Sequence, residues 1–257
     1  MRVIAMVNQK GGVGKTATTV NLGAALAEAG QRVLMVDLDP QGHMTKALGQ
    51  AETQGANLAI ALLGQWAGEL GDLVVEVSEG LYLIPTSEDM FLLEPQLYAR
   101  TGREHLLSVL LDAMAPAFDV CLIDCPPSLG ALTDSALVAA RSDNEHDGGV
   151  IIPVQAEDSS LDALRLLLRQ VDTLTGVLRL TVTMLGLVVN MYDARRGNVA
   201  TSTMGAYQSH PSLKVLATIQ DRKEVRQGWR YKKTVLAHAP ESEAAGWYRD
   251  LAKAVTS

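Results

Sequence analysis

Cysteines are scarce in this sequence, and it has no long uncharged apolar run. The 257 residues include only two cysteines, Cys121 and Cys125, and these lack the paired C-x-x-C sets of a zinc site. We expect both to be small buried thiols in a reducing compartment. The longest apolar stretches fall far short of the roughly 18–20 residues that span a bilayer, and the N-terminal residues lack a signal-peptide pattern. These absences favour a cytoplasmic protein.

The sequence also lacks an excess of positive charge. It has 22 Lys and Arg against 29 Asp and Glu, which gives a net charge of −7 at pH 7. This balance argues against a globally basic nucleic-acid-binding protein. It permits a local basic patch, because screening over about 8–10 Å lets separate faces act independently. No composition shift, Pro/Ser-rich linker or internal repeat divides the chain, so we expect residues 1–257 to form one domain.

Apolar runs alternate with helical stretches from end to end. This pattern predicts an α/β fold with a doubly wound, mostly parallel sheet that is covered by helices on both faces. Ligands of such sheets bind beyond the carboxyl ends of the strands, and the motifs described below fall at such ends. The predicted strands are Val3–Val7, Arg32–Asp37, Leu81–Pro85, Asp119–Asp124, Gly149–Val154, Thr183–Asn190 and Lys214–Ile219.

A glycine-rich loop follows the first of these strands. It matches the phosphate-loop pattern G-x-x-x-x-G-K-[ST], with Gln9 in place of the first glycine and Gly14-Lys15-Thr16 at the end. The strand before it and the helical stretch after it are the context that this motif requires. Its glycines let backbone N–H groups form an anion nest at a helix N-terminus. Lys15 can then reach the β- and γ-phosphates of a nucleotide, and the Thr16 hydroxyl can hold Mg²⁺.

Carboxylates end two of the predicted strands. Asp37 is the last residue of the second predicted strand and Asp39 follows it. Asp124 ends an apolar strand, as the aspartate of a Walker-B element does. Beside a phosphate loop, such groups can order Mg²⁺ and its waters, and one of them can orient an attacking water. The alternative for the Asp37–Pro40 segment is a turn or a helix N-cap, since Asp-Pro favours turns.

Lys10 adds a second lysine near the start of the loop. With it, the chain resembles the ParA/MinD family of deviant Walker-A ATPases, whose signature lysine occupies this position. The resemblance implies ATP and Mg²⁺ as cofactors and a homodimer in the ATP state, in which Lys10 reaches the partner's ATP. It implies that Asp39 positions water, that Asp37 contacts metal-bound water and that Asp124 binds Mg²⁺ through water. Nucleotide contacts are implied for Lys10, Gly11, Gly12, Val13, Gly14, Lys15, Thr16, Ala17, Asn190 and Asp221.

The same resemblance extends to two further segments. Residues 126–130 are similar to the loop that senses the γ-phosphate, and Pro153–Glu157 is similar to another family segment at a strand end. The sequence differs from the family pattern in two places. Ala17 replaces the usual Thr or Ser, and a basic stretch replaces the frequent Ser-Glu-Ala-Pro segment after the last strand. Alternatives stay open for two residues, since Lys10 could be a solvated loop lysine and Asn190 a turn residue.

Basic residues concentrate after the last two predicted strands, with Trp229 and Tyr231 interleaved. A solvated helix face explains many such runs. The alternative is binding to a phosphate backbone without sequence readout, which needs only cations on one face. In the partition branch of the family, arginines in these two regions bind DNA in that way. The resemblance therefore implies DNA contacts by Arg195, Arg196, Arg222, Lys223, Arg226 and Arg230, and Lys232 and Lys233 extend the run.

These features predict a ParA-like ATPase that hydrolyses ATP slowly and partitions a plasmid or chromosome. Lys10 and Lys15 would stabilise charge and Asp39 would orient water. The implied partners are non-specific DNA and a ParB-like centromere-binding protein that stimulates hydrolysis, so the protein is expected at the nucleoid and not at a membrane. The alternatives are a MinD-like membrane-associated ATPase, an iron–sulfur electron carrier and a metabolic ligase on the same fold.

Two segments bear on those alternatives. The stretch Glu241–Val255 has Ala244, Trp247 or Tyr248, Leu251 and Val255 on one helical face, together with several acidic residues. It predicts a packed terminal helix rather than a basic helix that docks on a membrane. The polar segment 142–149 looks like an insertion, and we expect it at the end of the sheet opposite the nucleotide.

Overall fold

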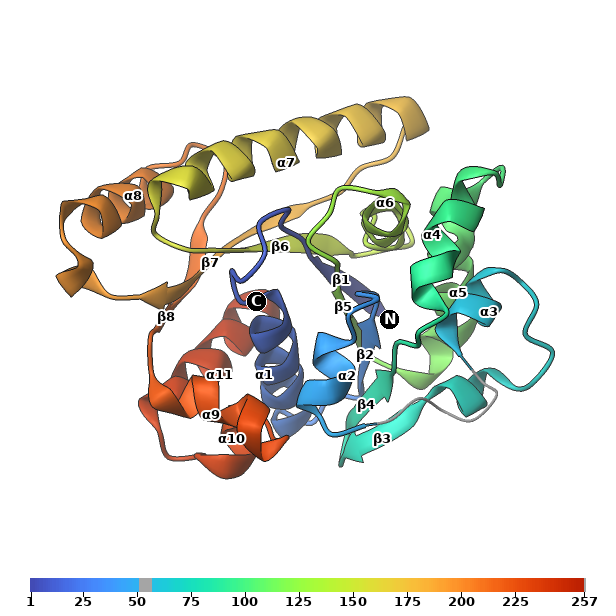
Figure 1. The fold of residues 1–257 in the computed structure, drawn as a ribbon, viewed down its shortest axis with the longest axis horizontal. Coiled ribbons are helices and arrows are strands. Elements are labelled where there is room, and N and C mark those ends of the chain that lie inside the picture. The colour runs from blue at the N-terminus through green and yellow to red at the C-terminus, as the bar shows by residue number, and fades with distance from the viewer. Residues whose placement is uncertain (51–56, 257) are drawn as a thin grey trace.

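The computed structural model describes residues 1–50 and 57–256, with the side chains of Asp158 and Arg196 left out (Figure 1). Within this part of the chain, eight strands form one sheet in the order β3-β4-β2-β5-β1-β6-β7-β8. Neighbouring strands are parallel except for β3 and β4. This confirms the doubly wound, mostly parallel sheet. The strands are β1 Arg2–Met6, β2 Val33–Asp37, β3 Val75–Ser78, β4 Leu81–Ile84, β5 Val120–Asp124, β6 Gly149–Val154, β7 Met184–Tyr192 and β8 Val215–Gln220.

Strand β3 is the one strand of this sheet that the sequence pattern missed. It pairs antiparallel with β4 at the edge of the sheet. Its residues alternate between half-buried and exposed, so it lacks the continuous apolar run that marks the inner parallel strands. The seven predicted strands are all present, with ends that differ by no more than two residues.

Helices cover both faces of the sheet (Figure 1). The α-helices are α1 Lys15–Glu28, α2 His43–Ala47, α3 Leu58–Leu62, α4 Met90–Tyr98, α5 Leu106–Met114, α6 Ala131–Ala139, α7 Asp158–Leu178, α8 Asn198–Gln208, α9 Lys223–Tyr231, α10 Val235–His238 and α11 Glu243–Thr256. Short 3-10 turns are η1 Leu70–Leu73, η2 Arg103–His105, η3 Ala115–Ala117 and η4 Ala194–Arg196.

The core has two layers, one on each face of the sheet. Successive residues of β1 alternate between them, so Ala5 joins one cluster while Ile4 and Met6 join the other, as the period of two in a strand requires. The first cluster contains leucines of α5, α6 and α7, and the second contains Leu22 of α1 and Leu251 of α11. A sheet buried on both faces holds the loops at its carboxyl edge in fixed positions.

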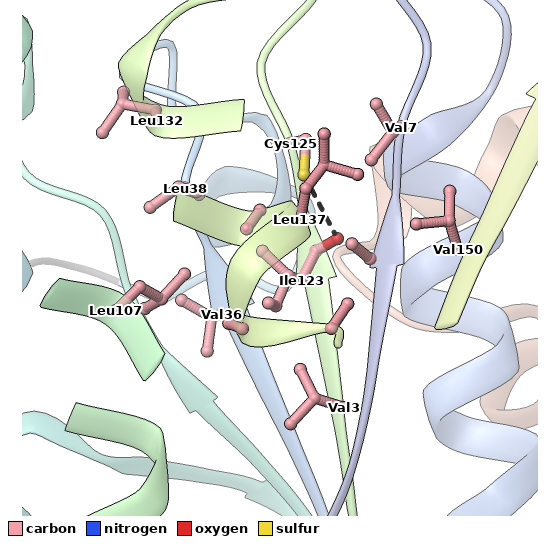
Figure 2. Close-up of a cluster of buried hydrophobic side chains, with 14 of the residues drawn as sticks. Val3, Val7, Val36, Leu38, Leu107, Ile123, Cys125, Leu132, Leu137 and Val150 are labelled. Atoms are coloured by element: carbon pink, nitrogen blue, oxygen red, sulfur yellow. Dashed lines mark hydrogen bonds between the residues drawn. The ribbon is translucent and has the colours of Figure 1, made fainter. Parts of the chain in front are cut away.

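The two cysteines lie in the first of these layers. Both side chains are buried and unpaired, and burial raises the pKa of each thiol. Figure 2 shows Cys125 beside Leu137 and Ile123 in this apolar cluster, and its Sγ lies 4.0 Å from the Ile123 carbonyl oxygen. The prediction of small buried thiols is confirmed. Such positions do not suit ligands of a surface iron–sulfur cluster.

The C-terminal helix α11 packs against α1 and β8. Its buried residues include Ala244, Tyr248, Leu251 and Val255, whereas Trp247 is only partly buried. The predicted packed helix is therefore confirmed, with Tyr248 as the core aromatic residue. The apolar face that could dock on a membrane is already covered. Among the described residues, no helix has the length and apolar character needed to cross a membrane.

Residues 142–149 lie where we expected them. Ser142 and Asp147 form an isolated antiparallel bridge, and the Ser142 hydroxyl donates a 2.7 Å hydrogen bond to the Gly148 carbonyl. The carboxylate of Asp147 lies 3.5 Å from the Arg2 guanidinium at the start of β1. The phosphate loop follows the other end of β1, so this segment is at the opposite edge of the sheet.

Candidate active site

The loop between β1 and α1 forms a cradle of backbone groups. Gly12 and Gly14 have φ angles of +75° and +87°, a region that L side chains rarely adopt. A Cβ atom at Gly14 would also lie 2.8 Å from the Asn190 side-chain nitrogen. That amide donates to the Val13 carbonyl at 2.9 Å and to Thr18 Oγ1 at 3.0 Å. Asn190 thus braces the loop from β7, and its contact to adenine stays a prediction.

Lys15 and Asn8 complete the cradle. The Lys15 ammonium is buried and donates to the Asn8 and Lys10 carbonyl oxygens at 3.0 and 3.3 Å. Desolvation lowers the Lys15 pKa, and the charges of Asp124 and Asp39 partly oppose this shift. Asn8 ties the loop to β6 by donating to the Pro153 carbonyl at 2.7 Å. The sequence analysis missed Asn8, whose role depends on a contact between distant segments.

The carboxylates of Asp37 and Asp124 face each other across neighbouring strands, since they are paired residues in the β2–β5 register. Asp124 Oδ2 accepts a 2.6 Å hydrogen bond from Thr16 Oγ1. Asp37 Oδ2 accepts from the backbone and hydroxyl of Thr45 at 2.7 and 2.6 Å. Burial is the main cause of their raised pKa values, about 6 for Asp37 and about 8 for Asp124. Ionised, the pair would repel.

These carboxylates fit a divalent cation. Within the described part of the chain, Asp37 Oδ1 and Asp124 Oδ1 are buried without a hydrogen-bond partner, and a buried oxygen of that kind is costly unless something pairs with it. The described residues contain no group of three His, Cys, Asp or Glu side chains that could hold a metal ion alone. Mg²⁺ suits such a site, because it usually keeps waters and binds substrate phosphates with one or two protein ligands.

Asp39 lies beside this pair, nearer to the open cavity. Its Oδ1 accepts a 2.9 Å hydrogen bond from the Gln41 backbone, and its Oδ2 lies 3.7 Å from His43 Nδ1. Asp39 therefore forms a local turn, which was the alternative interpretation of this segment, and it also faces the site. A carboxylate held in this way at a cavity wall can accept a proton from, or orient, a water molecule.

The side chain of Lys10 is bound by residues of the same chain. Its Nζ lies 2.6 Å from Glu157 Oε2 and 2.9 Å from Ser159 Oγ at the start of α7. Lys10 is thus paired rather than freely solvated, and it belongs to a network that joins the phosphate loop to the end of β6. The matching family segment Pro153–Glu157 supplies this partner.

A cavity of about 430 Å³ extends from the loop toward α9. Its walls include most of the predicted nucleotide residues, namely Gly11, Gly12, Gly14, Lys15, Thr16, Ala17, Asn190 and Asp221, together with Asp39. Val13 is buried beneath the loop. His43 and Trp229 also line the cavity, and sequence reasoning had not placed either at the site.

The predicted DNA-binding cations do not form a simple solvated face. Arg195 is 87% exposed and contacts Asp193 through two hydrogen bonds of 2.9 and 3.0 Å. Arg226 is 68% exposed and lies 3.0 Å from Asp221. Arg222 lies 3.6 Å from Glu243, and both Arg222 and Arg226 contribute to the cavity wall. Lys223 and Arg230 are exposed, and the Arg196 side chain lies outside the described structure.

Comparisons with known proteins identify relatives along the whole chain. Residues 1–184 match the family model described as an AAA domain. The chain is 36% identical to the sporulation initiation inhibitor protein Soj of Bacillus subtilis, covering 100% of this chain and 98% of Soj. It is 35% identical to the chromosome partitioning protein ParA of Caulobacter vibrioides, covering 100% of this chain and 94% of ParA.

Solved structures give the same picture of the fold. Cobyrinic acid a,c-diamide synthase from Mycobacterium smegmatis, solved with an ATP analogue and magnesium, is 34% identical with a TM-score of 0.81, covering 100% of this chain and 94% of that chain. The cell division ATPase MinD of Pyrococcus furiosus has a TM-score of 0.78 at 23% identity, covering 99% and 98%. The second likeness concerns the fold alone.

Proposed function

Because the chain belongs to the Soj/ParA family of partition ATPases, we propose that it forms an ATP-dependent sandwich dimer, binds DNA non-specifically at the nucleoid and partitions a plasmid or chromosome. A ParB-like partner would stimulate its slow hydrolysis of ATP. The observation that carries this proposal is the pair of lysines in one loop. Lys15 is buried in the phosphate cradle, whereas Lys10 is held at its rim by Glu157.

The hydrolytic roles follow from these positions. Phosphoryl transfer leaves little covalent chemistry to the protein, so positioning and charge set the rate. The loop N–H groups and Lys15 would bind the phosphates, and Asp39 would orient the attacking water. Thr16 and Asp124 would hold Mg²⁺ and Asp37 its waters, and the ion would neutralise phosphate charge when bound.

Lys10 explains why a lone subunit would hydrolyse ATP slowly. Its ammonium is neutralised by Glu157 at 2.6 Å, and it is not part of the cavity wall. In a face-to-face dimer, the partner's triphosphate would compete with Glu157 for this ammonium. A cation supplied in trans at the phosphates can accelerate hydrolysis by orders of magnitude.

Retention of random-sequence DNA tests the proposal. A gel-shift experiment should compare ATP, ADP and no nucleotide at two salt concentrations. We expect a shift with ATP only, and weaker binding at the higher salt concentration, because cations on phosphates release counterions. Binding that is equal in all three nucleotide states would reject nucleotide control. The absence of any shift at either salt concentration would reject a DNA-partition function.

Asp39→Ala is expected to trap a bound, non-hydrolysing dimer. The loop, Lys15 and Thr16 would remain, so ATP binding should persist while turnover falls about 100-fold or more, as for the loss of a water-orienting or general-base group. Release of phosphate and light scattering with ATP would be measured together. Turnover within about twofold of the parent would remove Asp39 from catalysis.

Arg195→Glu combined with Arg230→Glu is expected to abolish DNA retention and leave ATP binding intact, because both arginines are exposed and neither lines the cavity. The two substitutions change the local charge by four units, and non-specific binding depends on such charges. Arg165→Glu is the matched control, because Arg165 is a 70% exposed arginine on α7 with its own partner, Asp162 at 3.0 Å. DNA retention that survives in the double variant would move the binding surface elsewhere.

A further inference from the structure

Helix α2 lies against both carboxylates at the end of β2. Thr45 binds Asp37 through its backbone and hydroxyl groups, and His43 faces Asp39 Oδ2 at 3.7 Å. The helix is placed by Gly42, which has a φ of +64° and where a Cβ atom would lie 2.8 Å from Thr86 Cγ2. Helix α2 therefore binds Asp37 directly and places the His43 ring beside Asp39, the water-orienting group.

Helix α2 in turn packs against α9. The rings of His43 and Trp229 make an edge contact, with centroids 5.8 Å apart and planes at 63°, which is a favourable geometry for aromatic rings. At the other end of α2, a Cβ atom at Gly49 would lie 2.9 Å from Lys232 Cδ, just after α9 ends. One ring contact between the helices, and a close approach of the chain just beyond both of them, thus place α2 beside α9.

We propose that Trp229 and His43 are positioning residues that hold Asp39 for hydrolysis. Trp229 lies on α9 between Arg226 and Arg230, two of the cations proposed to contact DNA, and it lines the same cavity as Asp39. Helix α9 is then a shared element of the hydrolytic site and of the surface that meets a phosphate backbone. This inference rests on the proposed function, since it assigns Asp39 a role in turnover.

Steady-state hydrolysis by the full chain tests this proposal. Trp229→Ala should lower kcat about tenfold and change KM for ATP by less than about threefold, because it removes an interaction that matters in the transition state. Trp229→Phe should restore kcat to within about twofold, since it keeps an aromatic ring for His43. Tyr231→Ala is the control, because Tyr231 is on α9 but makes its edge contact with His238, at 5.5 Å between ring centroids.

A double-mutant cycle gives the second test. If His43 and Trp229 act as a unit, the double variant His43→Ala with Trp229→Ala should be no slower than the slower single variant. Effects on kcat that multiply would overturn the proposal. So would a Trp229→Ala variant with raised KM and unchanged kcat, which would make Trp229 a cavity wall only.

DNA retention separates this proposal from the one on which it rests. Trp229→Ala should still be retained on random DNA with a non-hydrolysable ATP analogue, because its arginines remain. A parent protein that fails to bind DNA counts against the partition function. A parent that binds DNA, with an unchanged kcat in Trp229→Ala, counts against the positioning role.

Discussion

Replacement of Lys10 by alanine is expected to abolish ATP-dependent dimerisation and to lower turnover at least about 100-fold. A cation placed at developing phosphate charge supplies a large part of the acceleration in such sites. The fold should not suffer, because Lys10 lies on a loop and its ion pair with Glu157 is partly exposed. Pairs of this kind contribute about 1 kcal/mol or less.

The measurement is light scattering with ATP, ADP and no nucleotide, alongside phosphate release. Lys253→Ala serves as the charge-matched control, because Lys253 is an exposed lysine on α11 whose partner is Asp250 at 3.0 Å. It should dimerise and turn over as the parent does. If the Lys10→Ala protein still forms an ATP-dependent dimer with ordinary turnover, the signature role of Lys10 is wrong.

The fold was largely predictable because the signals were local and strong. Inner parallel strands are apolar runs, and those of β1, β2, β5 and β6 are buried along almost their whole length. Strand β3 was not predicted, because an edge strand needs no such apolar run. Its pairing with β4 is specified by a short turn and by the sheet around it rather than by its own four residues.

The site was predictable where its residues are contiguous, as in the phosphate loop. The partners of those residues were not. Thr45 holds Asp37 from eight positions away, Asn8 reaches Pro153, and Asn190 crosses from β7 to the loop. Such contacts depend on which strands become neighbours, so they emerge only once the strand order is known.

The basic run shows a different limit of sequence reasoning. A cluster of arginines indicates positive charge but not the direction of each side chain. All three arginines have an acidic partner. Arg222 and Arg226 also line the cavity, whereas Arg195 is 87% exposed beside Asp193 and lies outside the cavity wall. Nucleotide and DNA would thus meet at the same helix, which a linear count of charges does not indicate.

The buried carboxylates make the nucleotide-free protein sensitive to pH. The pKa of Asp124 is raised to about 8 in the folded chain, against about 3.9 in an unfolded one. Between these values the folded state binds more protons than the unfolded state, so the free energy of unfolding falls as pH rises. Asp37, with a folded pKa of about 6, acts in the same direction over the lower part of that range. Stability should therefore decline from about pH 4 to pH 8.

Asp124→Asn is expected to separate stability from function. The amide keeps the size of the carboxylate and can still accept from Thr16, but it removes a charge that is costly to bury near pH 8. The nucleotide-free variant should melt about 5 °C or more above the parent at pH 8, with a flatter pH dependence of Tm. The gain in Tm that we expect of the parent with ATP and Mg²⁺ should be lost, because the charged oxygen that would bind the hydrated ion has gone.

Thermal melts from pH 5 to pH 8, with and without ATP and Mg²⁺, would measure both effects. Asp162→Asn is the control, since Asp162 is exposed on α7 beside Arg165, and it should melt and respond to ATP as the parent does. A lower Tm at pH 8 would mean that the Asp124 carboxylate stabilises the empty fold. An undiminished response to Mg²⁺ and ATP would mean that it does not hold the ion. We expect a higher Tm without ligand and a smaller response to ATP and Mg²⁺, because the buried Asp124 oxygen is costly without a cation and binds one when it is present.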